Sequence, residues 1–193
     1  MNKMNTKKLT ITALLGAITI VLAVTPLGFI PLGAMNATIM HIPVIIAGIL
    51  EGPLTGALVG LIFGITSLVN AILRPTITFY VLLNPLVSIF PRIMIGLVSS
   101  YVYKFISLAL KDKKSPIAIA SSAVAGSLTN SILVMGMIYL LYAERYMISI
   151  GQDPAFAKKF ILGIIITNGI PESIVAALIT LGIVRGVMRY KKR

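Results

Sequence analysis

The chain has 193 residues, of which 58% are hydrophobic and 11% are charged, with a mean hydropathy of +1.00. A soluble domain carries about 25% charged residues, so this composition excludes a water-soluble globular protein and a disordered chain. It also excludes a nucleic-acid-binding protein, although the formal net charge is +12. The chain holds no cysteine, which excludes disulfides and thiol chemistry. These numbers indicate an integral membrane protein, and the length predicts one domain over residues 1–193.

Six apolar stretches reach or approach the about 20 residues that a helix needs to cross the hydrocarbon layer. In chain order they are residues 9–24, 37–50, 53–73, 82–110, 117–142 and 160–184. The second stretch is short, but Glu51-Gly52-Pro53 is typical of a tight turn that starts the next helix, so we keep it as a span. None of the runs shows the two-residue alternation of a β-barrel wall. The sequence therefore predicts an all-α bundle of six transmembrane helices.

The basic residues predict how this bundle is oriented. With a cytoplasmic N-terminus, 12 of the 17 basic residues lie on the cytoplasmic side, and the other five are Arg74, Arg92, Arg145, Lys158 and Lys159. The positive-inside rule then places both termini in the cytoplasm. Thr25-Pro26-Leu27 lacks a small-residue cleavage site, so we expect the first stretch to be a span rather than a signal peptide. The longer connections, residues 25–36, 74–81 and 143–159, then face outward, which favours a site that opens outward.

Small residues form two patches on the predicted helices. Glycines recur every four positions from Gly48 to Gly64, and from Gly52 onward they predict a ridge without side chains along the third span. We interpret the ridge as packing within the bundle, with an intermolecular contact as the alternative. Ala13 and Ala17 lie one turn apart on the first span, and Gly16 widens their smooth patch, for which internal packing is again the first interpretation.

Two ionisable residues fall inside the predicted spans, where charge is costly and indicates function. Arg92 lies about eight residues into the fourth span, directly after Pro91, which frees a carbonyl as in helices that line a cavity. Glu172 lies at a similar depth in the sixth span. Two interpretations stay open: the residues form an internal ion pair, or Arg92 is presented to a substrate carboxylate while Glu172 accepts hydrogen bonds.

Neutral polar residues gather on the same three predicted helices. Asn84, Asn130 and Asn168 add donors and acceptors to the fourth, fifth and sixth spans, and Asn130 lies at a depth comparable to that of Glu172. Asn70 and Tyr80 lie near the outer ends and are positioned to cap such a cavity. Several amides at one depth favour a binding site over isolated contacts between helices.

Motifs for catalysis and for metals do not occur in the sequence. There is no P-loop, HExxH motif, nucleophile elbow or Cys/His cluster, and the lone His41 is expected to be a structural imidazole with satisfied hydrogen bonds. A membrane-embedded enzyme normally needs a second acid besides Glu172. A secondary transporter normally shows two related halves, and no internal repeat is evident. We expect no catalytic residue, metal or cofactor.

The chain resembles the substrate-binding subunits of energy-coupling factor (ECF) vitamin transporters over nearly its whole length. The resemblance rests on six short spans in under 200 residues, Ala13xxxAla17 on the first of them, and His41-Ile-Pro-Val-Ile-Ile running into Glu51-Gly-Pro-Leu-Thr-Gly-Ala. Together with Phe90-Pro-Arg-Ile-Met-Ile-Gly, the second stretch looks most like the pantothenate-specific members.

The resemblance implies a subunit of a bacterial cell membrane that captures a vitamin on the outer face. It implies docking on a transmembrane coupling subunit and two cytoplasmic ATPases, so this chain is not itself an enzyme. Residues Ala13, Gly16 and Ala17 would contact the coupling subunit. The ligand site of the family lies in the outer half, between the fourth to sixth helices, where Arg92, Asn130, Asn168 and Glu172 fall.

Pantothenate is the favoured ligand, with riboflavin, pyridoxine or a hydroxymethylpyrimidine as alternatives. A charge-assisted bond from Arg92 suits its carboxylate, and amide and carboxylate side chains suit its hydroxyl and amide groups. We expect Met135, Met137 and Tyr139 to supply apolar walls.

Overall fold

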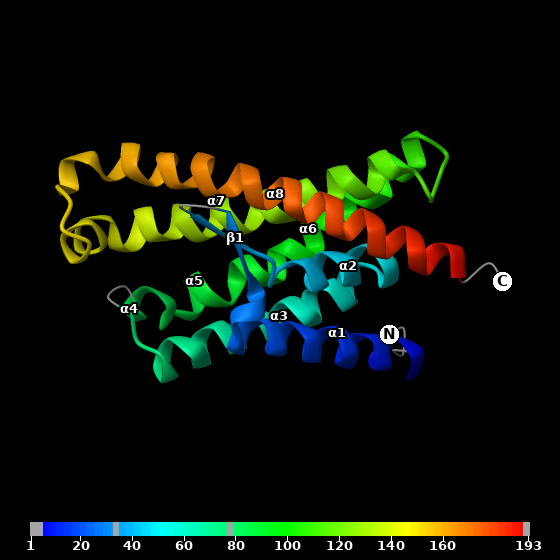
Figure 1. The fold of residues 1–193 in the computed structure, drawn as a ribbon, viewed down its shortest axis with the longest axis horizontal. Helices are drawn as coiled ribbons and strands as arrows, with labels where there is room; N and C mark the ends of the chain where they lie inside the picture. The colour runs from blue at the N-terminus through cyan, green and yellow to red at the C-terminus, as the bar shows by residue number, and fades with distance from the viewer. Residues whose placement is uncertain (1–5, 33–34, 77–78, 191–193) are drawn as a thin grey trace.

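The computed structural model describes residues 6–32, 35–76 and 79–190, and helices dominate it (Figure 1). The elements, in chain order, are α1 (Thr6–Val24), η1 (Pro26–Gly28), β1 (Phe29–Leu32), β2 (Met35–Thr38), α2 (Ile42–Glu51), α3 (Pro53–Leu73), α4 (Phe79–Leu82), α5 (Pro85–Ser88), α6 (Phe90–Ala109), α7 (Pro116–Ser149), η2 (Pro154–Phe156) and α8 (Ala157–Tyr190). The start of α1, the end of α8 and the α6–α7 connection lie at one end of the bundle, and α4 and the α7–α8 connection lie at the other (Figure 1).

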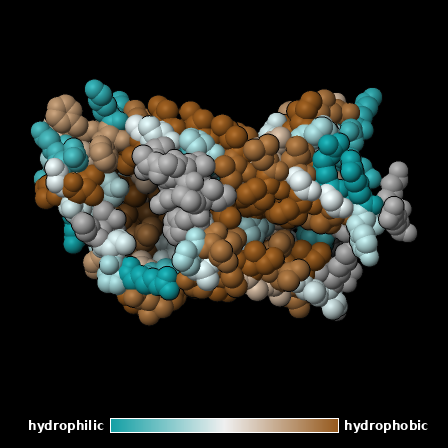
Figure 2. All heavy atoms as spheres, in the orientation of Figure 1, coloured by the Kyte–Doolittle hydropathy of each residue, from teal (hydrophilic) through white to brown (hydrophobic). Residues whose placement is uncertain are grey.

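Four segments of the described chain are long and apolar enough to cross a membrane. They are Pro53–Leu73, Pro85–Ala109, Pro116–Ser149 and Pro154–Tyr190, whereas Lys8–Val24 and Ile42–Glu51 are shorter apolar helices. Hydrophobic side chains cover the middle of the visible surface, and hydrophilic ones gather mostly at the two ends (Figure 2). A helix of 34 residues, the length of both α7 and α8, spans about 51 Å and so exceeds the about 30 Å hydrocarbon layer.

The second predicted span, residues 37–50, differs from the structure. Its first two residues belong to β2, which pairs antiparallel with β1 in a register that sets Phe29 opposite Thr38. Only ten residues are helical, starting beside Pro43, and Ile42 to Ile49 are all buried. A ten-residue helix rises about 15 Å, half of the hydrocarbon layer, so α2 is an element of the core rather than a lipid-facing span. The all-α expectation also missed this small hairpin.

The fourth predicted span is interrupted near its start. The Asn84 side chain accepts a hydrogen bond from the Leu86 backbone N–H at 3.0 Å and so starts α5 at Pro85. A second start follows at Phe90-Pro91, because proline has no N–H to continue the preceding turn. Arg92 is therefore the third residue of α6, beside the break, rather than a position deep in one continuous helix.

The glycine ridge packs inside the molecule, as predicted. A Cβ added at Gly56 would lie 2.9 Å from the Gly96 Cα, and one at Gly60 would overlap the backbone carbonyl of Arg92. The backbones of α3 and α6 are thus in direct contact, and this contact fixes the height of Arg92 in the bundle.

The small-residue patch of α1 is divided between two faces. A Cβ added at Gly16 would lie 2.7 Å from Ile62 Cδ1, so Gly16 packs against α3. Ala13 and Ala17 are exposed, whereas Gly16 is buried. The prediction that Gly16 shares their surface is therefore wrong.

Candidate functional site

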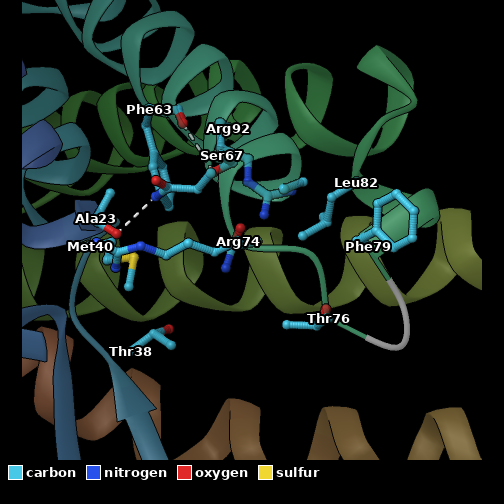
Figure 3. A pocket seen from close by; sticks show the side chains of 13 residues that line it. Ala23, Thr38, Met40, Phe63, Ser67, Arg74, Thr76, Phe79, Leu82 and Arg92 are labelled. Carbon is cyan, nitrogen blue, oxygen red and sulfur yellow. Dashed lines mark hydrogen bonds between the residues drawn. The ribbon is translucent and has the colours of Figure 1, made fainter. Parts of the chain in front are cut away.

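A cavity of about 410 Å³ lies where α3, β2, α4 and α6 meet, and we call it the large chamber (Figure 3). It is lined by Ala23, Thr38, Met40, Phe63, Ser67, Asn70, Ala71, Arg74, Thr76, Phe79, Leu82, Arg92 and Asn130. Two of these side chains are guanidinium groups, from Arg74 at the end of α3 and from Arg92 at the start of α6. The described lining residues thus bring two cationic groups and no carboxylate to the large chamber.

A second cavity of about 130 Å³, the small chamber, adjoins the first. Thr38, Arg92 and Asn130 line both cavities, so the two chambers form one site with a shared wall. The remaining lining of the small chamber comes from α7 and α8: Ser131, Val134, Met135, Ile164, Ile165, Asn168 and Glu172. The large chamber thus adds Arg74 to the shared Arg92, whereas the small chamber adds an apolar wall, an amide and a carboxylate.

Arg92 is buried, with a side chain only 8% exposed. Its Nη1 donates a hydrogen bond to the Val87 carbonyl at 2.6 Å, and its Cζ lies 5.5 Å from the centre of the Phe63 ring. Its Nε is buried and has no hydrogen-bond partner within the described part of the chain. A buried cation is costly unless an anion or several acceptors neutralise it, and among the described residues this guanidinium has one carbonyl and one aromatic ring.

Glu172 binds the hairpin rather than Arg92. Its Oε1 accepts hydrogen bonds from the Thr38 backbone N–H at 3.0 Å and from the Thr38 hydroxyl at 2.9 Å. Between these two described side chains no ion pair is formed, so the ion-pair interpretation is wrong. Glu172 instead joins β2 to α8 and closes one wall of the small chamber.

The amide side chains divide into two groups. Asn130 and Asn168 face the chambers, and the buried Asn130 Oδ1 has no partner among the residues that the structure describes. Asn70 also lines the large chamber, where its Nδ2 donates to the Ala23 carbonyl at 2.8 Å and joins α3 to α1 (Figure 3). Asn84 lies in neither lining, because its Oδ1 caps α5 and its Nδ2 donates to the Tyr142 hydroxyl at 3.0 Å.

The expectation that Tyr80 caps the cavity is not met. Its hydroxyl lies 3.1 Å from the Ser149 Oγ, and the Arg145 guanidinium carbon lies 4.2 Å from the centre of its ring. Tyr80 therefore faces α7, while its neighbour Phe79 lines the large chamber. Of the expected apolar walls, Met135 lines the small chamber, whereas Met137 packs in the same apolar cluster without lining a chamber and Tyr139 is exposed.

Sequence reasoning missed Phe63, Arg74, Thr38 and Met40. Phe63 lies on α3 beside the glycine ridge, so its position in the sequence indicates a residue that packs between helices. Arg74 directly follows α3, and the sequence predicted it to be a loop residue, although its side chain lines the large chamber (Figure 3). Thr38 and Met40 lie in the hairpin and turn that were expected to be helical.

The remaining polar groups offer no metal site in the described residues, which hold no group of three His, Cys, Asp or Glu side chains. His41 is buried, as expected of a structural imidazole, but within residues 6–32, 35–76 and 79–190 the expected hydrogen-bond partner of its Nε2 is not found. The site is therefore suited to binding through hydrogen bonds and one or two guanidinium groups.

Comparison with known proteins agrees with a transport component. The pantothenic acid transporter PanT of Lactococcus lactis subsp. cremoris (strain MG1363) is 27% identical to this chain over 173 residues, which cover 81% of the chain and 80% of that protein. The family model described as ECF transporter, substrate-specific component, matches residues 7–184. The chain is a member of this family of ECF transporter substrate-specific components, which are parts of transporters rather than enzymes.

Proposed function

We propose that this chain is the pantothenate-binding subunit of an ATP-driven ECF importer in a bacterial cell membrane. The observation that carries the proposal is Arg92, a buried guanidinium at the wall shared by the two chambers, whose Nε has no partner among the described residues. The carboxylate of pantothenate would supply the anionic partner of this guanidinium. The similarity to a pantothenic acid transporter supports the same ligand.

The chambers fit the two ends of this molecule. The large chamber, at about 410 Å³, is within the about 300–1,000 Å³ range of small-molecule sites. Its guanidinium groups favour the carboxylate end, with Arg92 as the buried partner and the exposed Arg74 at the rim. The small chamber favours the hydroxylated end of pantothenate. Met135 and the neighbouring aliphatic side chains offer an apolar wall for the carbon skeleton of that end, and Asn168 and Glu172 offer partners for its hydroxyl groups.

The polar side chains between these ends match the remaining groups of pantothenate. The unpartnered Asn130 Oδ1 is an acceptor for an amide N–H or a hydroxyl. Asn168 supplies both donors and an acceptor, and Glu172 retains acceptor sites beyond the two hydrogen bonds from Thr38, since a carboxylate has about four.

We predict that Arg92→Ala weakens pantothenate binding by at least about 30-fold, because removing one partner of a buried charge pair costs about 2 kcal/mol or more. Pantothenol, in which a hydroxyl replaces the carboxylate, is expected to bind the wild-type protein much more weakly than pantothenate and to lose little on the substitution. Titration calorimetry on the purified proteins measures both affinities, and Asn168→Ala tests the small chamber in parallel.

Arg189→Ala is the matched control, since Arg189 is an exposed arginine in the last turn of α8, away from both chambers. Unchanged pantothenate affinity in both Arg92→Ala and Asn168→Ala would contradict the proposed site. Wild-type protein that binds riboflavin, pyridoxine or a hydroxymethylpyrimidine in preference to pantothenate would keep the transporter role and reject the ligand.

We also propose that both termini are cytoplasmic, because 12 of the 17 basic residues gather at that end. The chain has no cysteine, so single cysteines report this directly. We predict that Gln152→Cys reacts with a membrane-impermeant maleimide in intact cells, and that Lys113→Cys reacts only after permeabilisation. The reverse pattern would invert the topology.

The exposed face of Ala13 and Ala17 is proposed as the contact with a transmembrane coupling subunit, which in turn carries two cytoplasmic ATPases. Two small residues one turn apart let another helix approach the α1 backbone closely. Gly16 is not part of this face, because it packs against Ile62.

We predict that the double substitution Ala13→Leu and Ala17→Leu lowers pantothenate uptake by about tenfold, the effect of a loss of about 1.4 kcal/mol of contact. Binding to the purified subunit should be unchanged, because neither residue lines a chamber. Gly136→Leu on α7, where an added Cβ meets open space, provides the control. Normal uptake by the double variant would exclude this face.

A further inference from the structure

Helix α4 presents two different faces to its surroundings. Phe79 and Leu82 line the large chamber (Figure 3). Tyr80 points the other way and contacts the outer part of α7, where its ring meets that of Tyr142 edge to face with centres 5.9 Å apart. A wall of the chamber is therefore attached to α7 from behind.

Five residues make this attachment, and we call them the outer clamp: Tyr80, Asn84, Tyr142, Arg145 and Ser149. The Tyr80 hydroxyl lies 3.1 Å from the Ser149 Oγ, and the Arg145 guanidinium carbon lies 4.2 Å from the centre of the Tyr80 ring. The Asn84 Nδ2 donates to the Tyr142 hydroxyl at 3.0 Å. None of the five residues lines either chamber.

The clamp is connected to Arg92 through helix α5. The Ser88 hydroxyl hydrogen-bonds to the carbonyls of Leu82 and Asn84, which holds α4 and α5 together. The Val87 carbonyl, in the same short helix, accepts the 2.6 Å hydrogen bond from Arg92 Nη1. A helix of four residues is not stable by itself, so the position of this carbonyl depends on what α5 is attached to.

We propose that the outer clamp positions the Arg92 guanidinium for the ligand carboxylate, and that Tyr142, Asn84 and Tyr80 are positioning residues of the pantothenate site. This inference rests on the proposed function. Asn84 sets both the start of α5 and its attachment to α7, so it fixes where the Val87 carbonyl lies. That carbonyl occupies Nη1, while Nε has no hydrogen-bond partner among the described residues.

The test compares Tyr142→Phe with wild-type protein, using pantothenate and pantothenol as probes. The substitution removes only the hydroxyl that accepts from Asn84, and the loss of one such bond predicts about fivefold weaker pantothenate binding. Pantothenol, which has no carboxylate for Arg92, should lose little affinity. Titration calorimetry measures pantothenate, and displacement of bound pantothenate measures the weaker analogue.

Tyr139→Phe is the matched control, because Tyr139 lies one turn earlier on α7 and is 40% exposed. It should leave both affinities unchanged. Tyr80→Phe, which removes the contact with Ser149, provides a second variant and should show the same selective loss if Tyr142→Phe fails to fold.

The other possible results of these binding measurements would each contradict a different part of the proposal. An equal loss for both ligands would show that the clamp only maintains the chamber, and no loss for either would show that Arg92 is positioned without it. Wild-type protein that binds neither ligand would overturn the proposed function, and the clamp proposal with it.

Discussion

The Arg92 guanidinium is held inside the bundle by one carbonyl and one aromatic ring, with its Nε unpartnered in the described chain. Much of the surrounding structure follows from this constraint. Gly60 lets α3 approach the Arg92 backbone, and Pro91, which has no N–H for the carbonyl four residues earlier, leaves the Val87 carbonyl to Arg92. The protein therefore maintains a cation whose electrostatic requirement is incompletely met, which is the condition for recognising an anion in a low-dielectric site.

The β1–β2 hairpin and α8 form the opposite wall of the site, and Glu172 holds them together. Glu172 fastens the β1–β2 hairpin to α8 through Thr38, and it thereby leaves Arg92 without this carboxylate. If the two charged groups paired with each other, a ligand carboxylate would have to compete for the guanidinium. Arg92 lines both chambers and Glu172 lines only the small one, so the two ends of the site differ chemically although the two charged groups do not pair.

The sequence alone identified the residues whose position inside the membrane is energetically costly. Arg92, Glu172, Asn130 and Asn168 stand out because polar groups at membrane depth are expensive, and the structure brings all four to one pair of chambers. The spacing of the glycines likewise predicted their internal packing. Features that depend on local chain direction were missed. The short helices α4 and α5 direct Tyr80 and Asn84 toward α7, and the first residues of the expected second span belong to the hairpin instead. Arg74 reaches the chamber only because α3 ends where it does, which periodicity alone does not determine.

A structure of the purified protein with pantothenate bound tests the central claim most directly. The account predicts that the carboxylate of the ligand accepts a hydrogen bond from Arg92 Nε, while Nη1 keeps its bond to the Val87 carbonyl and Glu172 keeps Thr38. A bound ligand whose carboxylate lies away from Arg92, or a bound state in which Arg92 pairs with Glu172, would contradict it.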